Sequence, residues 1–288
     1  MSPVPSIKEL LIGADVIVRR NRRQLIVVLL LFGAIGWILP ILLPTLAQPK
    51  TFLKSLLDLA CGFLSMTMVY GLYRFVLLTV REGGARLGVL FSGFSRVMLK
   101  IDAVILLCVA ILMGAMLTGM IACAIIEAIW KACAGANAAS FPREIATAVL
   151  MLSALFGLMM LLLWPHVMSD NVQLGATKII ARSLKITKGS RGTFLCLGLL
   201  LFVPSLLVNL SIKSAISGLF PSLSRADSIH LGLVVSWPIC AVFLWPHLYT
   251  AIALYYEAAR KRYNEANATV APQPPADSNP PTTPPAAQ

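Results

Sequence analysis

The sequence has few charged residues and few histidines, and they form no pattern that is typical of a catalytic site. Asp, Glu, Lys and Arg make up 12% of the 288 residues, and there are 3 histidines. The motifs HExxH, GxSxG and GxGxxG are absent, as are the phosphate-binding P-loop and any closely spaced pair of carboxylates. We therefore expect no catalytic residues and no cofactor, and we predict that the chain is not an enzyme.

Cysteine and acidic residues are also sparse. The 6 cysteines form no CxxC motif and mostly lie within apolar runs, where cysteine usually acts as a small buried hydrophobic residue. Only two histidines share a motif, with no cysteine or carboxylate beside them, so no metal site is expected. Acidic residues close to span ends, such as Asp170, are expected to be solvated at the interface or to cap helices.

Hydrophobic residues make up 58% of the sequence, which is above the fraction typical of soluble domains. The first long apolar run follows the basic cluster Arg19–Arg23, and no small-residue cleavage pattern comes close behind it. We interpret this run as a membrane helix that is retained rather than as a signal peptide. The predicted fold class is therefore an all-α integral membrane protein.

Six apolar runs are long enough to cross a membrane, since a helix of about 20 residues spans the hydrocarbon core. The predicted spans are Leu25–Pro44, Leu56–Val80, Ile101–Ala128, Ile145–Val167, Phe194–Ile216 and Leu231–Tyr255. Between these spans, Lys and Arg alternate, with 18 on one side and 6 on the other. Because positive residues favour the cytoplasmic side, both termini are predicted to be cytoplasmic. The net charge of +12 then indicates attraction to anionic headgroups rather than nucleic acid binding.

The segments before spans one, three and five have apolar residues at helical spacing with basic residues between them. Each is predicted to be a cytoplasmic amphipathic helix that lies in the membrane interface. The apolar faces are Ile7, Leu10, Leu11, Ala14 and Val18 in the first, Leu87, Leu90, Phe91, Phe94 and Met98 in the second, and Val172, Ala176, Ile179, Ile180 and Ser183 in the third.

An internal repeat is indicated by the tetrapeptide LWPH, which occurs at Leu163–His166 and again 81 residues later at Leu244–His247. Fixed periods usually mean a duplicated structural unit. We predict three hairpin repeats, at about 5–80, 85–167 and 172–257, in a pseudo-threefold bundle within a membrane domain of residues 1–262. Residues 263–288 are rich in Pro and Ala and are predicted to form a disordered cytoplasmic tail.

The LWPH copies contain the candidate site residues His166, His247, Trp164 and Trp245. One hypothesis is that the two histidines face each other around a cavity open to the cytoplasm and bind a phosphate or lipid headgroup. The alternative, which we favour, is that each proline frees a backbone carbonyl and that His and Trp satisfy it locally. The candidate lipid-contacting basic residues are Arg86, Arg96, Lys100, Lys178, Arg182, Lys185, Lys188 and Arg191.

The stretch from Pro165 to Leu201 resembles the central signature of a family of bacterial and archaeal six-span membrane proteins of unknown function. The matching positions are an Asp-Asn turn at Asp170 and Asn171, followed by Ser183, Gly189 and Arg191. The resemblance implies a multi-pass protein of the bacterial inner membrane. A more distant similarity, to the membrane domain of some glycerophosphodiester phosphodiesterases, does not imply their activity, because this sequence contains no such soluble domain.

These observations favour a non-enzymatic membrane protein that binds or organises anionic lipids at the cytoplasmic leaflet. One alternative is a transporter for a small or lipidic solute. The other is a scaffold that recruits a protein partner through residues 264–288.

Overall fold

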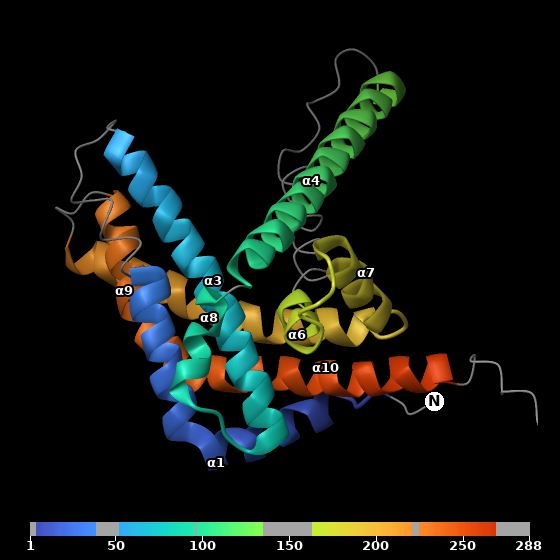
Figure 1. The fold of residues 1–288 in the computed structure, drawn as a ribbon. Helices are drawn as coiled ribbons and strands as arrows, with labels where there is room; N and C mark the ends of the chain where they lie inside the picture. The colour runs from blue at the N-terminus through green and yellow to red at the C-terminus, as the bar shows by residue number, and fades with distance from the viewer. Residues whose placement is uncertain (1–3, 39–51, 96, 135–162, 221–224, 269–288) are drawn as a thin grey trace, which may run out of the picture.

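In the computed structural model, residues 4–38, 52–95, 97–134, 163–220 and 225–268 are described, and every regular element in these ranges is a helix (Figure 1). The helices are α1 (Ile7–Gly33), the π-helix η1 (Ala34–Ile38), α3 (Phe52–Glu82), the 3₁₀-helix η2 (Leu87–Phe94), α4 (Met98–Ala134), α6 (Trp164–Asp170), α7 (Ala176–Ile186), α8 (Arg191–Leu219), α9 (Arg225–Phe243) and α10 (Trp245–Ala268). The helix α10 thus continues past the predicted start of the tail.

Three helices, α3, α4 and α8, are long and apolar enough to cross a membrane, and a fourth span results if α9 and α10 are counted together. They coincide with predicted spans two, three and five. The prediction of an all-helical protein with several apolar spans is therefore confirmed. The first span lies partly outside the described residues and the fourth almost wholly outside them, so the six spans and the threefold repeat stay predictions.

The first predicted interfacial helix is continuous with the first predicted span, which the sequence analysis did not anticipate. Ser6 and Glu9 cap the start of α1 reciprocally, and the helix kinks at Asn21, whose backbone is non-helical (φ −114°, ψ 19°). The predicted apolar face is present but does not face lipid. Leu10, Ala14 and Val18 are buried, and α1 packs along α10.

The sixth predicted span is divided between two helices, α9 and α10, which qualify as a membrane span only when they are taken together. The chain bends by 55° between α9 and α10, because Pro246 has no N–H for the preceding turn. The bend matches the kink in α1. After the kink in α1, the Leu29 carbonyl accepts a hydrogen bond from Trp237 Nε1 of α9 at 3.4 Å. Before the kink, Asp15 Oδ1 lies 3.4 Å from His247 Nε2 of α10. The two chain segments therefore run antiparallel and bend together.

The second predicted interfacial helix is a 3₁₀-helix that packs along α3, and not an α-helix with one apolar face. A Cβ atom at Gly71 would lie only 1.8 Å from the Leu90 carbonyl oxygen, so the two backbones touch. Gly93 approaches the Thr67 carbonyl in a similar way. These contacts bury Leu90 and leave Leu87, Phe91 and Phe94 exposed.

The third predicted interfacial helix is the helix α7, with the expected apolar face. Ile179, Ile180 and Ser183 are buried, together with Ile186. The helix packs against α4, α6 and α10. By contrast, α4 extends away from the other helices and exposes most of its apolar side chains (Figure 1).

The contact between Gly71 and Leu90 generates a stability prediction. Gly71→Ala inserts a methyl group against a backbone that cannot move independently, and overpacking of this kind costs about 2 kcal/mol. Thermal unfolding of the detergent-solubilised protein should show this loss. The matched control is Gly62→Ala in the same helix, where no atom lies within 4 Å of the new Cβ. Equal unfolding temperatures for the two variants would contradict the close packing of η2 on α3.

Candidate functional site

The first LWPH copy places His166 in the interior, at the junction of α3, α6 and α10. Its side chain is fully buried, and neither ring nitrogen has a hydrogen-bond partner within the part of the chain that the structure describes. The imidazole lies between two tyrosines, with ring centroids 5.0 Å from Tyr73 and 5.2 Å from Tyr256 in edge-on geometry. A buried imidazole without a charged partner is expected to be neutral, because an unpaired buried charge is costly.

The second copy lies at the bend between α9 and α10 and has different neighbours. His247 is about a third exposed and approaches Asp15 of α1. Trp245 Nε1 donates to Ser205 Oγ at 3.3 Å, and its ring packs edge-on against Trp237. Trp164 of the first copy is buried.

The two copies therefore occupy unlike surroundings. No direct contact between the histidines is found: His166 meets aromatic rings of α3 and α10, whereas His247 pairs with α1. The carbonyl that Pro165 would free belongs to Leu161, which lies outside the described residues, so the local alternative stays a prediction for the first copy.

Next to His166 lies an ion-pair network that joins three helices. Asp170, at the end of α6, accepts two hydrogen bonds from the Arg81 guanidinium, at 2.6 and 2.9 Å. Its second oxygen also lies 3.0 Å from Arg260 and accepts from the Tyr256 hydroxyl at 2.8 Å. Arg81 Nε in turn donates to Glu257 at 2.9 Å. The network thus connects the C-terminal end of α3 to α6 and α10.

Asp170 is charged at neutral pH despite its position. Its side chain is only 9% exposed, which corrects the expectation of a solvated span end. Burial raises the pKa of this carboxyl, but hydrogen bonds from Arg81 and Tyr256 and the charge of Arg260 lower it more, so the net pKa lies below its ordinary value.

Arg81, Tyr256, Glu257 and Arg260 were not singled out in the sequence. A usable signal existed: Arg81, Asp170 and Glu257 each lie at or just beyond the end of a predicted span on the same predicted side of the membrane. Residues of opposite charge at one depth are candidates for pairing, because bare charges next to hydrocarbon are unfavourable.

The predicted basic residues fall into two groups. Arg86, Lys178, Lys185, Lys188 and Arg191 are exposed. Lys100 donates to the Val172 carbonyl, and the Arg182 guanidinium lies 5.9 Å from the centre of the Tyr263 ring. Arg96 lies outside the described residues.

The contacts of this arrangement are structural, since they join helices to one another. The described residues contain no group of three or more His, Cys, Asp or Glu side chains that could hold a metal ion. The polar groups around His166 instead fix the relative positions of α3, α6 and α10.

The network predicts that Asp170→Asn destabilises the fold. Breaking a fully buried ion pair costs about 3–5 kcal/mol, and because Arg81 is 27% exposed we expect about 2 kcal/mol here. Thermal unfolding in detergent measures the effect. The matched control is Asp15→Asn, which removes partly exposed ion pairs with Arg19 and His247 and should change little.

The Asp170 carboxylate also makes the free energy of unfolding depend on pH. Because its folded pKa lies below the unfolded value of about 3.9, its contribution is complete above that pH and is lost as the pH falls below it. As the pH falls below this value, the wild-type protein should lose more stability than Asp170→Asn. Equal losses of stability in the two proteins would contradict the network.

Comparison of the chain with models of known protein families, with curated proteins and with solved structures finds no match.

Proposed function

We propose that this chain is a non-enzymatic integral membrane protein that binds anionic lipid headgroups at the cytoplasmic leaflet. The observation that carries the proposal is a cluster of four exposed cations on α7, on the turn that follows it and at the start of α8: Lys178, Lys185, Lys188 and Arg191. Within the described ranges, no carboxylate forms an ion pair with any of them, whereas Arg81 and Arg260 are neutralised within the protein.

The position of this cluster suits a headgroup site. The opposite face of α7 is buried through Ile179, Ile180 and Ile186, so the cations point away from the protein. The apolar helix α8 begins at Arg191 and is long enough to cross a membrane. Cations at the start of a span lie at headgroup level, where each contributes about 1 kcal/mol of attraction to an anionic leaflet.

Neighbouring basic residues hold this cluster in place. Arg262 of α10 donates to the Lys188 carbonyl and to Ser190 Oγ, so it anchors the turn between α7 and α8. Lys100 and Arg182 make the internal contacts described above. The lipid contact is thus assigned to four of the eight basic residues selected from the sequence, while Arg86 lies in the turn between α3 and η2.

A transporter is a second proposal, supported by the bend between α9 and α10 and by His166, whose ring nitrogens have no hydrogen-bond partner in the described part of the chain. Discontinuous helices often surround transporter binding sites. If transport opens a cavity at this junction, His166 becomes accessible to solvent and diethyl pyrocarbonate modifies it in membranes. Mass spectrometry of the Leu163–Asp170 peptide detects this modification. Protection of His166 while the partly exposed His247 is modified would count against transport. The scaffold hypothesis concerns residues 264–288, of which only 264–268, at the end of α10, are described, so it stays a prediction.

The lipid proposal predicts the composition of copurified lipid. Replacing Lys178, Lys185, Lys188 and Arg191 by Gln should lower the ratio of anionic to zwitterionic lipid in the gently solubilised protein, because each lost cation weakens headgroup binding by about fivefold. Native mass spectrometry and lipid extraction measure this ratio.

The matched control keeps the charges and changes the side chains: Lys178, Lys185 and Lys188 become Arg, and Arg191 becomes Lys. This variant should retain anionic lipid. An unchanged ratio in the Gln variant, with an unchanged unfolding temperature, would overturn the proposal.

A further inference from the structure

The segment of α1 before its kink has an exposed apolar face that no part of the described chain covers. Ile12 and Val16 are 56% and 64% exposed. They are distinct from the predicted apolar face, since Leu10, Ala14 and Val18 are buried against α10. The segment therefore has two apolar faces, of which the protein uses one.

The exposed pair is flanked by cations in a regular row. Lys8, Ile12, Val16 and Arg20 are four residues apart along the helix, so they form one stripe on its surface, and all four are exposed. We call this row the α1 stripe. Neither of its cations forms an ion pair with a described carboxylate, and the nearby Asp15 pairs with Arg19 and His247.

We propose that the α1 stripe docks on an anionic lipid surface, with Ile12 and Val16 inserted below the headgroups and with Lys8 and Arg20 at the phosphates. This inference rests on the proposed function and adds a second lipid contact to it. An apolar centre with basic ends is the pattern of helices that lie in the interface plane. The bends support this placement, since they direct the first part of α1 away from the rest of that helix and α10 away from α9 (Figure 1).

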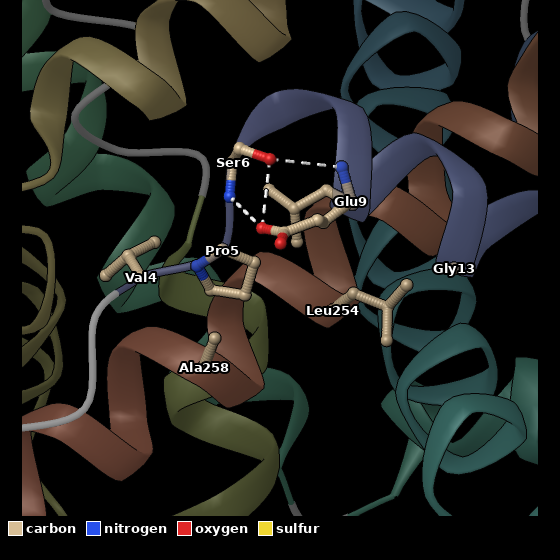
Figure 2. Close-up of a pocket in the computed structure, with 8 residues that line it drawn as sticks. Val4, Pro5, Ser6, Glu9, Gly13, Leu254 and Ala258 are labelled. Atoms are coloured by element: carbon tan, nitrogen blue, oxygen red, sulfur yellow. Dashed lines mark hydrogen bonds between the residues drawn. The ribbon is translucent and has the colours of Figure 1, made fainter.

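A shallow hollow opens between α1 and α10 beside the stripe. Figure 2 shows it lined mostly by apolar groups, among them Val4, Pro5, Leu254 and Ala258. The Glu9 carboxylate at its rim is held by the Ser6 backbone N–H at 2.7 Å and by the Ser6 hydroxyl. The apolar lining suits an acyl chain, while the carboxylate directs anionic headgroups toward Lys8 and Arg20.

A second copy of the chain fits the stripe less well. An antiparallel pair of stripes would set Lys8 against Arg20, and a parallel pair would set each cation against its own copy. Both arrangements place like charges together and are unfavourable. Charge complementarity therefore favours anionic lipid over self-association.

Photocrosslinking tests the inference directly. The full-length protein, with p-benzoylphenylalanine at position 12 or at position 16, is reconstituted into phosphatidylcholine nanodiscs with or without phosphatidylglycerol. We expect lipid adducts at both positions by mass spectrometry, and more adduct when phosphatidylglycerol is present. The matched control position is Asn264, an exposed polar residue of α10, where no lipid adduct is expected.

Changing Lys8 and Arg20 to Gln should remove the dependence on phosphatidylglycerol. Absence of lipid adducts at both positions would overturn the inference, and so would chain-to-chain adducts, which would instead indicate a second copy. Because α7 is unchanged in these proteins, their copurified lipid reports the proposed function separately. Loss of the adducts with that lipid retained would refute the α1 stripe alone.

Discussion

The carboxylate of Asp170 is the contact on which the arrangement of the helices depends. It receives Arg81 from α3 and both Arg260 and Tyr256 from α10, so three elements far apart in sequence meet at one pair of oxygens. The helix α6 is too short to be stable alone and owes its position to such tertiary contacts. His166, one turn earlier, is held between its tyrosines by the same arrangement. The network pairs the buried Asp170 with partly exposed charges, so that two acidic and two basic groups neutralise one another at the edge of an apolar core.

Hydropathy and length were sufficient to predict the helices α3, α4 and α8, because a long apolar run has few alternatives to a helix in lipid. The same reasoning failed for η2. The spacing of its apolar residues resembled that of an amphipathic helix, but its conformation depends on the backbone contact between Gly71 and Leu90. A contact between two residues far apart in sequence produces no repeating pattern in the sequence. Pro246 did signal a bend within the last span, and the structure shows that the bend separates two helices.

The polar junction was harder to predict than the spans. Asp170 was visible as a span-end residue, yet its partner Arg81 lies 89 positions earlier, and charge alone does not specify which residues pair. The LWPH copies show that identical residues can have different surroundings. Four identical residues are surrounded by tyrosines in one copy and by Asp15 and Trp237 in the other. The identity of the two copies predicts a duplicated unit, whereas the surroundings of each copy are set by the rest of the fold.

The antiparallel pairing of α1 with α9 and α10 has a consequence for biogenesis. The helix α1 leaves the ribosome long before α9 and α10, so its partner surface does not exist until those helices have been made. Contacts of such long sequence separation are slow to form. During this interval Leu10, Ala14 and Val18 have no protein to cover them, and the membrane surface is the nearest apolar medium. The bilayer would thus hold α1 in place until α10 is made, and the pairing of the two helices would move α1 from a lipid partner to a protein one.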